Sequence, residues 1–192
     1  MFKDLICRFT TICAGLLALC VAMSFAKAQG KSVYTDVDLR GCQLVAEAQE
    51  GEGEWATFRC PGYGGLAVFV TEADLRFSLG YGVNWQQQKS STQFLGPFNT
   101  VGKKLEWRLK AGKVAATILR YYTETGSEGR KGQILVVSKV SAGQACHVAY
   151  VDALANKGAN VLAQYAADFV APSFNCASDE PLHLGRRGVS PF

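Results

Sequence analysis

The clearest pattern in the chain is an alternation of apolar and polar residues that predicts β-strands through its central part. LEWRLK (105–110) alternates strictly, which predicts Leu105, Trp107 and Leu109 in a core and the charged residues between them in water. LRFSLGY (75–81) alternates in the same way, with Leu75, Phe77, Leu79 and Tyr81 on the inward face. LAVFV (66–70) is continuously apolar instead, which predicts a strand covered on both sides.

Further segments extend this strand pattern towards both ends of the chain. CQLVAEA and EWATFRC flank a glycine-rich turn at 49–53, and VAATILRYYT follows the short turn at Ala111-Gly112. QILVVSKV and CHVAYVDA come next, separated by a turn that contains Gly143. Short connections between successive strands favour antiparallel pairing, so the sequence predicts a mainly antiparallel sheet structure.

After CHVAYVDA the apolar spacing changes from that of a strand to that of a helix. The spacing places six residues on one helical side, predicted to pack on the sheet: Val161, Leu162, Tyr165, Ala166, Phe169 and Val170. Asn156 or Asn160 could cap the start of this helix, and Pro172 should end it. The predicted fold class is α+β, a sandwich or open barrel-like antiparallel sheet with a C-terminal helix packed on it.

The first 28 residues have the pattern of a secretory signal peptide. Lys3 and Arg8 precede an uncharged run at 9–26, and Ala26-Lys27-Ala28 forms a small-residue cleavage site. The alternative is a retained membrane anchor, because 18 uncharged residues are the lower limit for a span. Cleavage predicts a periplasmic or secreted protein with no stable membrane span, one domain at 29–178, and a flexible, polar tail at 179–192.

The cysteines that remain after cleavage indicate disulfide bonds. Cys42, Cys60, Cys146 and Cys176 are an even number in an exported chain, which is typical of two disulfides. Four cysteines allow three pairings. The positions of the predicted strands favour Cys42–Cys60 and Cys146–Cys176, and the second pair would hold the helix against its preceding strand.

The neighbours Cys146 and His147 raise the question of a catalytic or metal-binding pair. Attack by the thiolate of Cys146 requires a reduced sulfur, and adjacent strand residues point to opposite faces. Haem attachment needs C-x-x-C-H, but Gly143 stands where the first cysteine would be. His147 and His183 are the only histidines of the chain, too few for a zinc cluster. We therefore expect no metal and no cofactor, and a buried, hydrogen-bonded His147.

The long connection at 81–102 is the best candidate for a binding surface. It carries Trp85, Gln87, Phe94 and Phe98 among other amide and hydroxyl side chains. Connections of this length are often functional, and aromatic residues mixed with amides are typical of surfaces that contact proteins or sugars. The alternative is an ordinary loop whose aromatic residues pack into the core.

Charge and the remaining polar residues narrow the functional class. The mature chain would carry 17 basic and 15 acidic residues, a balance that argues against a nucleic-acid partner. The glycines of PGYGGL (61–66) join two strands, which favours a tight turn over a dinucleotide site. Glu72, Asp74 and Asp152 lie near predicted strand ends and could serve an envelope hydrolase. That enzyme is the alternative to a non-enzymatic binding or inhibitory domain.

Three segments carry a resemblance to a known family. WATFRCPGYGGLAVFVTEADLRFSLGYG, LEWRLKAGKVAATILRY and CHVAYVDALAN resemble those of a family of small exported bacterial proteins of proteobacterial type, whose function is uncharacterised. The resemblance implies a signal peptide and a compact extracytoplasmic domain, and it carries no active site to this chain. Size and disulfide use are also similar to those of periplasmic lysozyme inhibitors, by analogy only. The partner expected on this reading is an envelope protein or glycan.

Overall fold

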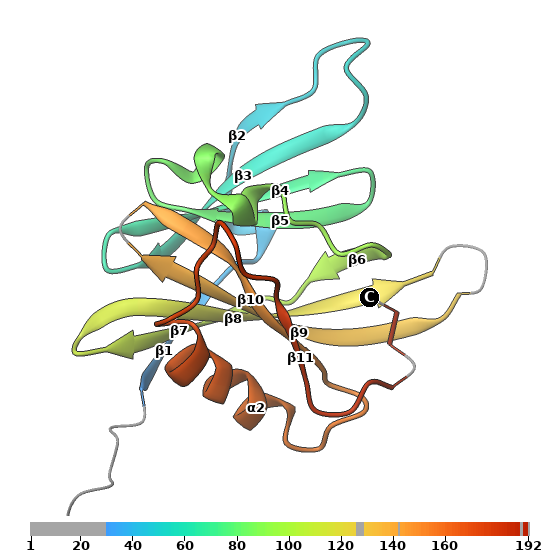
Figure 1. Cartoon of the computed structure of the whole chain (residues 1–192). Coiled ribbons are helices and arrows are strands. Elements are labelled where there is room, and N and C mark those ends of the chain that lie inside the picture. Colours follow the sequence, from blue (N-terminus) through green and yellow to red (C-terminus); the bar gives the residue numbers. More distant parts are fainter. Residues whose placement is uncertain (1–29, 126–128, 142, 189, 192) are drawn as a thin grey trace, which may run out of the picture.

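The computed structural model describes residues 30–192 except 126–128, 142, 189 and 192 (Figure 1), so the expected signal peptide lies outside the described residues. The described part contains two β-sheets. The larger sheet has the strand order β1 (Lys31–Asp36), β7 (Lys104–Lys110), β8 (Lys113–Glu124), β9 (Lys131–Ser141), β10 (Gln144–Asp152) and β11 (Leu182–Leu184), and β6 (Phe98–Val101) pairs with β8. The smaller sheet has the order β2 (Gln43–Glu47), β3 (Trp55–Tyr63), β4 (Leu66–Ala73) and β5 (Arg76–Tyr81).

The predicted fold class is confirmed. Every strand pairing in the described part is antiparallel except that of β10 with β11. The helix α2 (Ala159–Tyr165) continues into the π-helical turn η4 (Ala166–Val170) and ends before Pro172, as predicted. Contacts join α2 to β9 and β10, and join η4 to β7 and β8, so the helical segment lies on the larger sheet.

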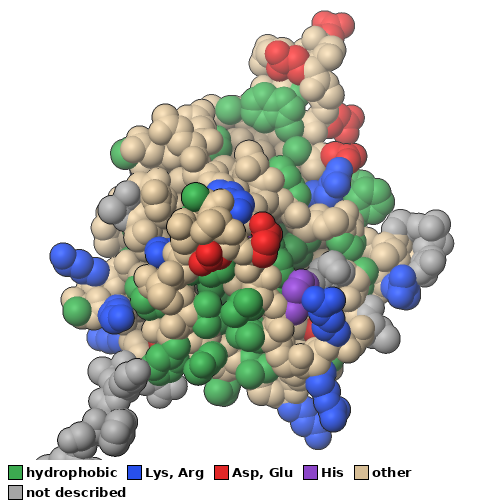
Figure 2. All heavy atoms as spheres, viewed as in Figure 1, with side chains coloured by type: hydrophobic (Ala, Val, Ile, Leu, Met, Phe, Trp, Pro, Cys, Tyr) green, Lys and Arg blue, Asp and Glu red, His purple; other side chains and the backbone are tan. Residues whose placement is uncertain are grey.

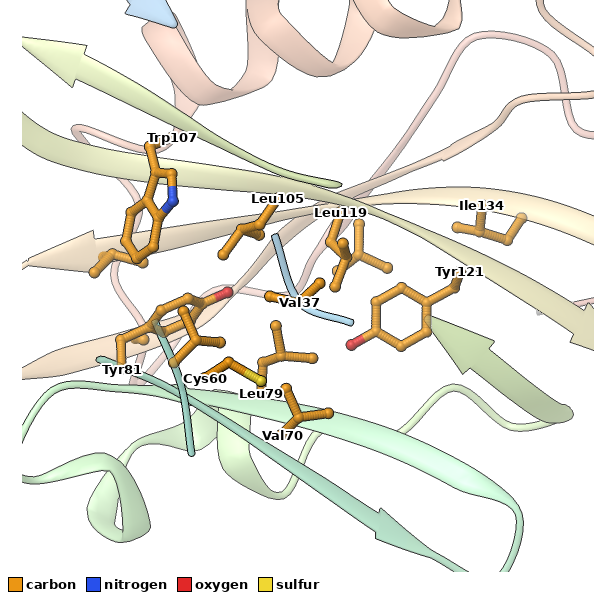
Figure 3. Close-up of a cluster of buried hydrophobic side chains, with 14 of the residues drawn as sticks. Val37, Cys60, Val70, Leu79, Tyr81, Leu105, Trp107, Leu119, Tyr121 and Ile134 are labelled. Carbon is orange, nitrogen blue, oxygen red and sulfur yellow. The ribbon is translucent and has the colours of Figure 1, made fainter. Parts of the chain in front are cut away.

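The first hydrophobic core fills the space between the two sheets (Figure 3). The inward positions predicted for LEWRLK are confirmed, because Leu105 and Trp107 are fully buried and Leu109 nearly so. The indole of Trp107 lies edge-on to Tyr81 at a centroid distance of 5.9 Å, and its N–H donates to Thr35 Oγ1 at 2.8 Å. This hydrogen bond removes the cost of burying the indole nitrogen.

A second core lies between the larger sheet and the helix, and it confirms half of the predicted helix face. Of the six predicted residues, Ala166 is fully buried and Leu162 and Val170 pack against this core, whereas Val161, Tyr165 and Phe169 are 66, 54 and 43% exposed. Ala163, which was not predicted on this face, is also fully buried. Small side chains let the helix backbone approach the sheet closely. The π-helical turn also adds a residue to the turn after Tyr165, which displaces the later positions from a regular helical period.

The start of the helix also differs from the prediction. Gly158 is the N-cap residue, and no side chain caps it. Asn156 instead bridges two backbone segments: its amide donates to the carbonyl oxygens of Asp152 and Arg186, each at 2.8 Å. It therefore joins the end of β10 to the C-terminal segment.

One predicted water-facing residue of β7 is buried. Arg108 is 3% exposed, and its guanidinium donates to both carboxylate oxygens of Asp168, at 3.0 and 2.5 Å. Glu106 and Ser32 complete this polar cluster, since Ser32 Oγ donates to Glu106 Oε1 at 2.5 Å. The alternation had correctly separated the two faces of β7, but η4 covers the face that would otherwise meet water.

Both favoured disulfides are present. Cys42–Cys60 links the residue that precedes β2 to β3, with Cα atoms 4.5 Å apart. Cys146–Cys176 links β10 to the segment after the helix, with a Cα separation of 5.6 Å. The two bonds are features of proteins that fold in an oxidising, extracytoplasmic compartment.

The C-terminal segment belongs to the folded domain, contrary to the tail predicted at 179–192. Leu182–Leu184 forms β11 beside β10. Beyond it, the backbone N–H of Gly188 and the hydroxyl of Ser190 donate to the carboxylate of Asp152, at 3.0 and 2.7 Å. The polar composition of this segment suggested mobility. The hydrogen bonds that hold it join residues that are distant in the sequence, so local composition could not reveal them.

Candidate functional site

A groove of about 1070 Å³ opens at one end of the sandwich and receives residues from both sheets. Volumes of this size are typical of ligand sites. Five of its lining side chains are apolar or aromatic, and they come from several separate elements: Leu75, Phe77, Phe98, Tyr122 and Leu154. The groove therefore presents an apolar surface where the two sheets separate.

The turn between β4 and β5 forms one wall of the groove. Asp74 and Leu75 occupy left-handed backbone conformations, with φ of 50° and 58°. Glu72 Oε1 accepts the N–H of Leu75 at 2.9 Å, and Asp74 forms an ion pair with Arg76. The tight turn directs Leu75 outward, where it is 62% exposed. The inward position predicted for Leu75 is wrong because the strand begins one residue later.

The short strand β6 forms the next wall and is fixed by a buried asparagine. The N–H of Asn99 donates to the carbonyl oxygen of Leu75 at 2.9 Å, and Asn99 Oδ1 accepts the N–H of Phe77 at 3.0 Å. These bonds hold β6 against β5 and place Phe98, which is 40% exposed, at the groove. Sequence reasoning identified Phe98 but missed Asn99, whose role depends on pairing across 22 residues.

Thr123 of β8 contributes a buried hydroxyl group to the lining of the groove. Thr123 is 2% exposed and lines the groove, yet its Oγ1 has no hydrogen-bond partner in the described part of the chain. A Cβ at Gly132 would lie 2.6 Å from this oxygen and 2.7 Å from Cα and Cβ of Ser190, so a glycine on β9 is needed for Thr123 and Ser190 to pack this closely. Buried polar atoms without partners are uncommon and often mark functional positions.

The rim of the groove is predominantly acidic. Four carboxylates and one ammonium group belong to its lining: Glu54, Glu72, Asp74, Glu124 and Lys131. Glu47, Glu50 and Glu52 are exposed on the adjoining β2–β3 hairpin, which we call the acidic arm. Figure 2 shows acidic side chains gathered over the end of this hairpin. Seven of the 16 acidic residues of the chain thus lie on the arm or the groove.

The structure separates the four residues predicted to form a binding surface. Only Phe98 lines the groove. Trp85 stacks on Phe69 of β4 at a centroid distance of 4.8 Å, so its ring covers the outer side of the smaller sheet. Gln87 and Phe94 are exposed elsewhere on the connection. The loop therefore combines both interpretations: one of its aromatic rings packs on a sheet and another lines the groove.

The connection around these residues is held by the side-chain amides of Gln88 and Gln93. Gln88 makes two hydrogen bonds with the backbone of Tyr81, at 2.8 and 2.7 Å. Gln93 Oε1 accepts the N–H of His147 at 2.7 Å, which joins the connection to β10. These bonds fix the loop between the two sheets.

His147 is buried and hydrogen-bonded, as predicted. It is 2% exposed, its Nδ1 lies 2.9 Å from the hydroxyl of Tyr150, and burial lowers its pKa to about 3. The ring is therefore neutral, and the neighbouring Cys146 is in a disulfide. His147 and Tyr150 share a face because a bulge between His147 and Ala149 inserts an extra residue, which corrects the simple alternation expected for this strand.

The three carboxylates considered for catalysis do not form one site. Glu72 and Asp74 line the groove, where each has the partner in the β4–β5 turn described above. Asp152 does not line the groove and is saturated by donors from the C-terminal segment and from the turn after β10. The geometry therefore assigns Asp152 a structural role.

Comparison with protein-family models, with curated proteins and with solved structures finds no match to this chain. The resemblance drawn from its three segments stays a prediction. Among residues 30–192, outside the gaps, no helix has the length and apolar character needed to span a membrane. Within the same residues, no group of three or more His, Cys, Asp or Glu side chains is arranged to hold a metal ion.

Proposed function

We propose that the protein is an exported, non-enzymatic binding domain that holds part of an envelope partner, a protein or a glycan, in the groove at the end of the sandwich. The groove itself is the observation that carries this proposal. Its walls are fixed by the strands, the β4–β5 turn and Asn99, so the site exists before a ligand arrives. Preformed sites avoid the entropic cost of ordering their walls on binding.

The exposed aromatic ring of Phe98 supplies the apolar contact in this proposal. Large side chains that leave water at the centre of an interface contribute most to affinity. Phe94 offers a matched comparison, because it comes from the same connection and is similarly exposed, 37% against 40%, yet lies outside the groove.

A capture experiment tests the proposal with this pair. The oxidised protein is immobilised and exposed to solubilised envelope extract and to purified peptidoglycan. A partner retained by the wild type and by Phe94→Ala, but not by Phe98→Ala, supports binding in the groove. Absence of specific retention by the wild type, or equal retention by both variants, contradicts it. Circular dichroism and urea unfolding establish that each variant is folded.

A further inference from the structure

We infer that the ligand of the groove is a positively charged protein segment that also carries apolar side chains. This inference rests on the proposed function and specifies the chemistry of its ligand. Three independent features of the groove support it: the charge of its rim, the apolar character of its walls, and the hydroxyl of Thr123.

The charge of the rim favours a cationic ligand. Glu54 and Glu124 are exposed, and no ion pair involves either of them in the described part of the chain. Asp74 is paired with Arg76, and Glu72 accepts one backbone N–H, so these two are partly satisfied by the protein itself. The acidic arm adds its glutamates on the same side. Such a field attracts Lys and Arg side chains and repels acidic segments.

The apolar side chains of the walls favour a ligand that carries apolar groups as well as positive charges. Phe98 and Leu75 present exposed apolar surface at the groove, and Phe77 lies behind them in the lining. A purely basic segment would leave this surface in water. A segment in which basic and apolar residues alternate could direct its cations to the rim and its apolar side chains to the walls.

The hydroxyl of Thr123 favours a ligand with hydrogen-bonding groups along its length. Its Oγ1 is buried and has no partner in the described residues, which costs about 1–3 kcal/mol for an isolated polar atom. A peptide offers a backbone N–H and C=O at every residue. Ser190 fills the space at Gly132, so one such group would have to reach the hydroxyl from the groove, which Thr123 lines.

Matched peptides test the chemistry of the ligand. The probes are three fluorescent decapeptides of alternating Lys and Leu, Ser and Leu, or Glu and Leu, and an N-acetylglucosamine tetrasaccharide is added as a competitor. Fluorescence polarisation measures binding at low salt. The Lys/Leu probe should bind about tenfold more tightly than the Ser/Leu probe, the Glu/Leu probe should not bind, and 0.5 M salt should weaken the first of these complexes.

Two pairs of variants locate the interaction. Glu54→Gln with Glu124→Gln should weaken the Lys/Leu complex by about threefold to tenfold, because two ion pairs with the ligand are lost. Asp36→Asn with Glu180→Gln makes the same change in net charge at exposed positions outside the groove and should leave the affinity unchanged.

The outcomes separate the inference from the proposed function. If the Ser/Leu probe binds as tightly as the Lys/Leu probe, or the tetrasaccharide competes fully, and the binding requires Phe98, then the cationic ligand is refuted and binding in the groove stands. Equal effects of the two charge-variant pairs also refute the cationic ligand. If no probe binds in a manner that depends on Phe98, the cationic ligand is refuted, and the groove proposal is decided by the capture experiment with Phe98→Ala and Phe94→Ala.

Discussion

The carboxylate of Asp152 holds the C-terminal segment onto the end of β10, and its removal is the most direct test of that role. The side chain is 1% exposed. Oδ1 accepts the N–H groups of Leu154 and Ala155 at 2.9 and 3.1 Å, and the hydroxyl of Ser190 at 2.7 Å. Oδ2 accepts the N–H of Gly188 at 3.0 Å and that of Ser190 at 3.4 Å.

Asp152→Asn retains the size of the side chain but gives it one acceptor in place of two. The better orientation keeps the amide oxygen at the Oδ1 position and directs the NH₂ group at two N–H donors, those of Gly188 and Ser190. A hydrogen bond to a charged group contributes about 1.5–3 kcal/mol, and the 3.4 Å bond contributes less. We therefore expect the free energy of unfolding to fall by about 2–4 kcal/mol.

Urea unfolding at pH 7, followed by tryptophan fluorescence, measures this loss. Asp36→Asn is the control, because Asp36 is exposed and pairs only at the surface with Lys104; its loss should be below about 0.5 kcal/mol. Amide exchange should also accelerate at Gly188 and Ser190 in Asp152→Asn. A loss below about 1 kcal/mol, with exchange at these amides unchanged, would refute the role assigned to Asp152.

The pH dependence of the free energy of unfolding provides a second test of the role of Asp152. Burial acts to raise the pKa of Asp152, but the hydrogen bonds from Ser190, Ala155, Leu154 and Gly188 outweigh it and hold the pKa below the ordinary 3.8. A lowered pKa contributes stability above the ordinary value, and that stability is lost as the pH falls through the lowered one. The difference between wild type and Asp152→Asn should therefore narrow as unfolding is repeated at progressively lower pH below 4.

Three further predictions concern the core and its covalent links. Burial lowers the pKa of His147 to about 3, so at pH 5 this histidine is neutral in the folded protein but protonated in the unfolded chain. The free energy of unfolding should therefore fall by about 2 kcal/mol between pH 7.5 and 5. Titration of this imidazole near pH 6.5 in an NMR experiment would contradict the prediction. Replacing Cys146 and Cys176 together by Ala should cost about 3–4 kcal/mol in urea unfolding, and a cost below 1 would argue against it. Ala163→Leu should cost about 1–3 kcal/mol and Val161→Ala less than about 0.5, and the reverse order would contradict the helix face.

The sequence predicted the inward face of the strands because alternation is a local property of the backbone. Leu105, Trp107 and Leu109 are buried where the pattern placed them. The other face of the same strand depends on what covers it, and the ion pair between Arg108 and Asp168 joins residues 60 positions apart. Local periodicity contains no information about that contact.

The helix shows a different limit of the same reasoning. Its predicted face assumed a constant helical period, and the π-helical turn at Ala166–Val170 changes that period within the segment. Ala166 was on the predicted face, but the buried Ala163 and Ala167 were left off it, because a search for a hydrophobic face gives most weight to large side chains. Close packing on a sheet instead selects small residues, which leaves Tyr165 and Phe169 at the surface.

The candidate site could be predicted only in part, since one of its walls came from the recognised loop and the others came from distant elements. Composition identified an unusual connection at 81–102 but gave no direction for its aromatic rings. Phe98 reaches the groove because Asn99 attaches β6 to β5, whereas Trp85 is turned onto Phe69. The unpartnered hydroxyl of Thr123 is a property of the folded chain and has no sequence signal.

Residues whose burial or exposure differs from the pattern of apolar and polar positions nevertheless help to locate the groove. Leu75 should point inward and instead lies 62% exposed at the groove, and Phe98 begins a strand with a large apolar side chain in water. Arg108 also departs from its pattern, but it is buried and its charge is matched by Asp168, so packing explains it. Single exposed apolar residues are ordinary, but Leu75 and Phe98 line the same groove and so form one exposed apolar surface. The exposure of Leu75 and Phe98 therefore favours a ligand at the groove. The burial of Arg108 needs no ligand, because its ion pair with Asp168 accounts for it.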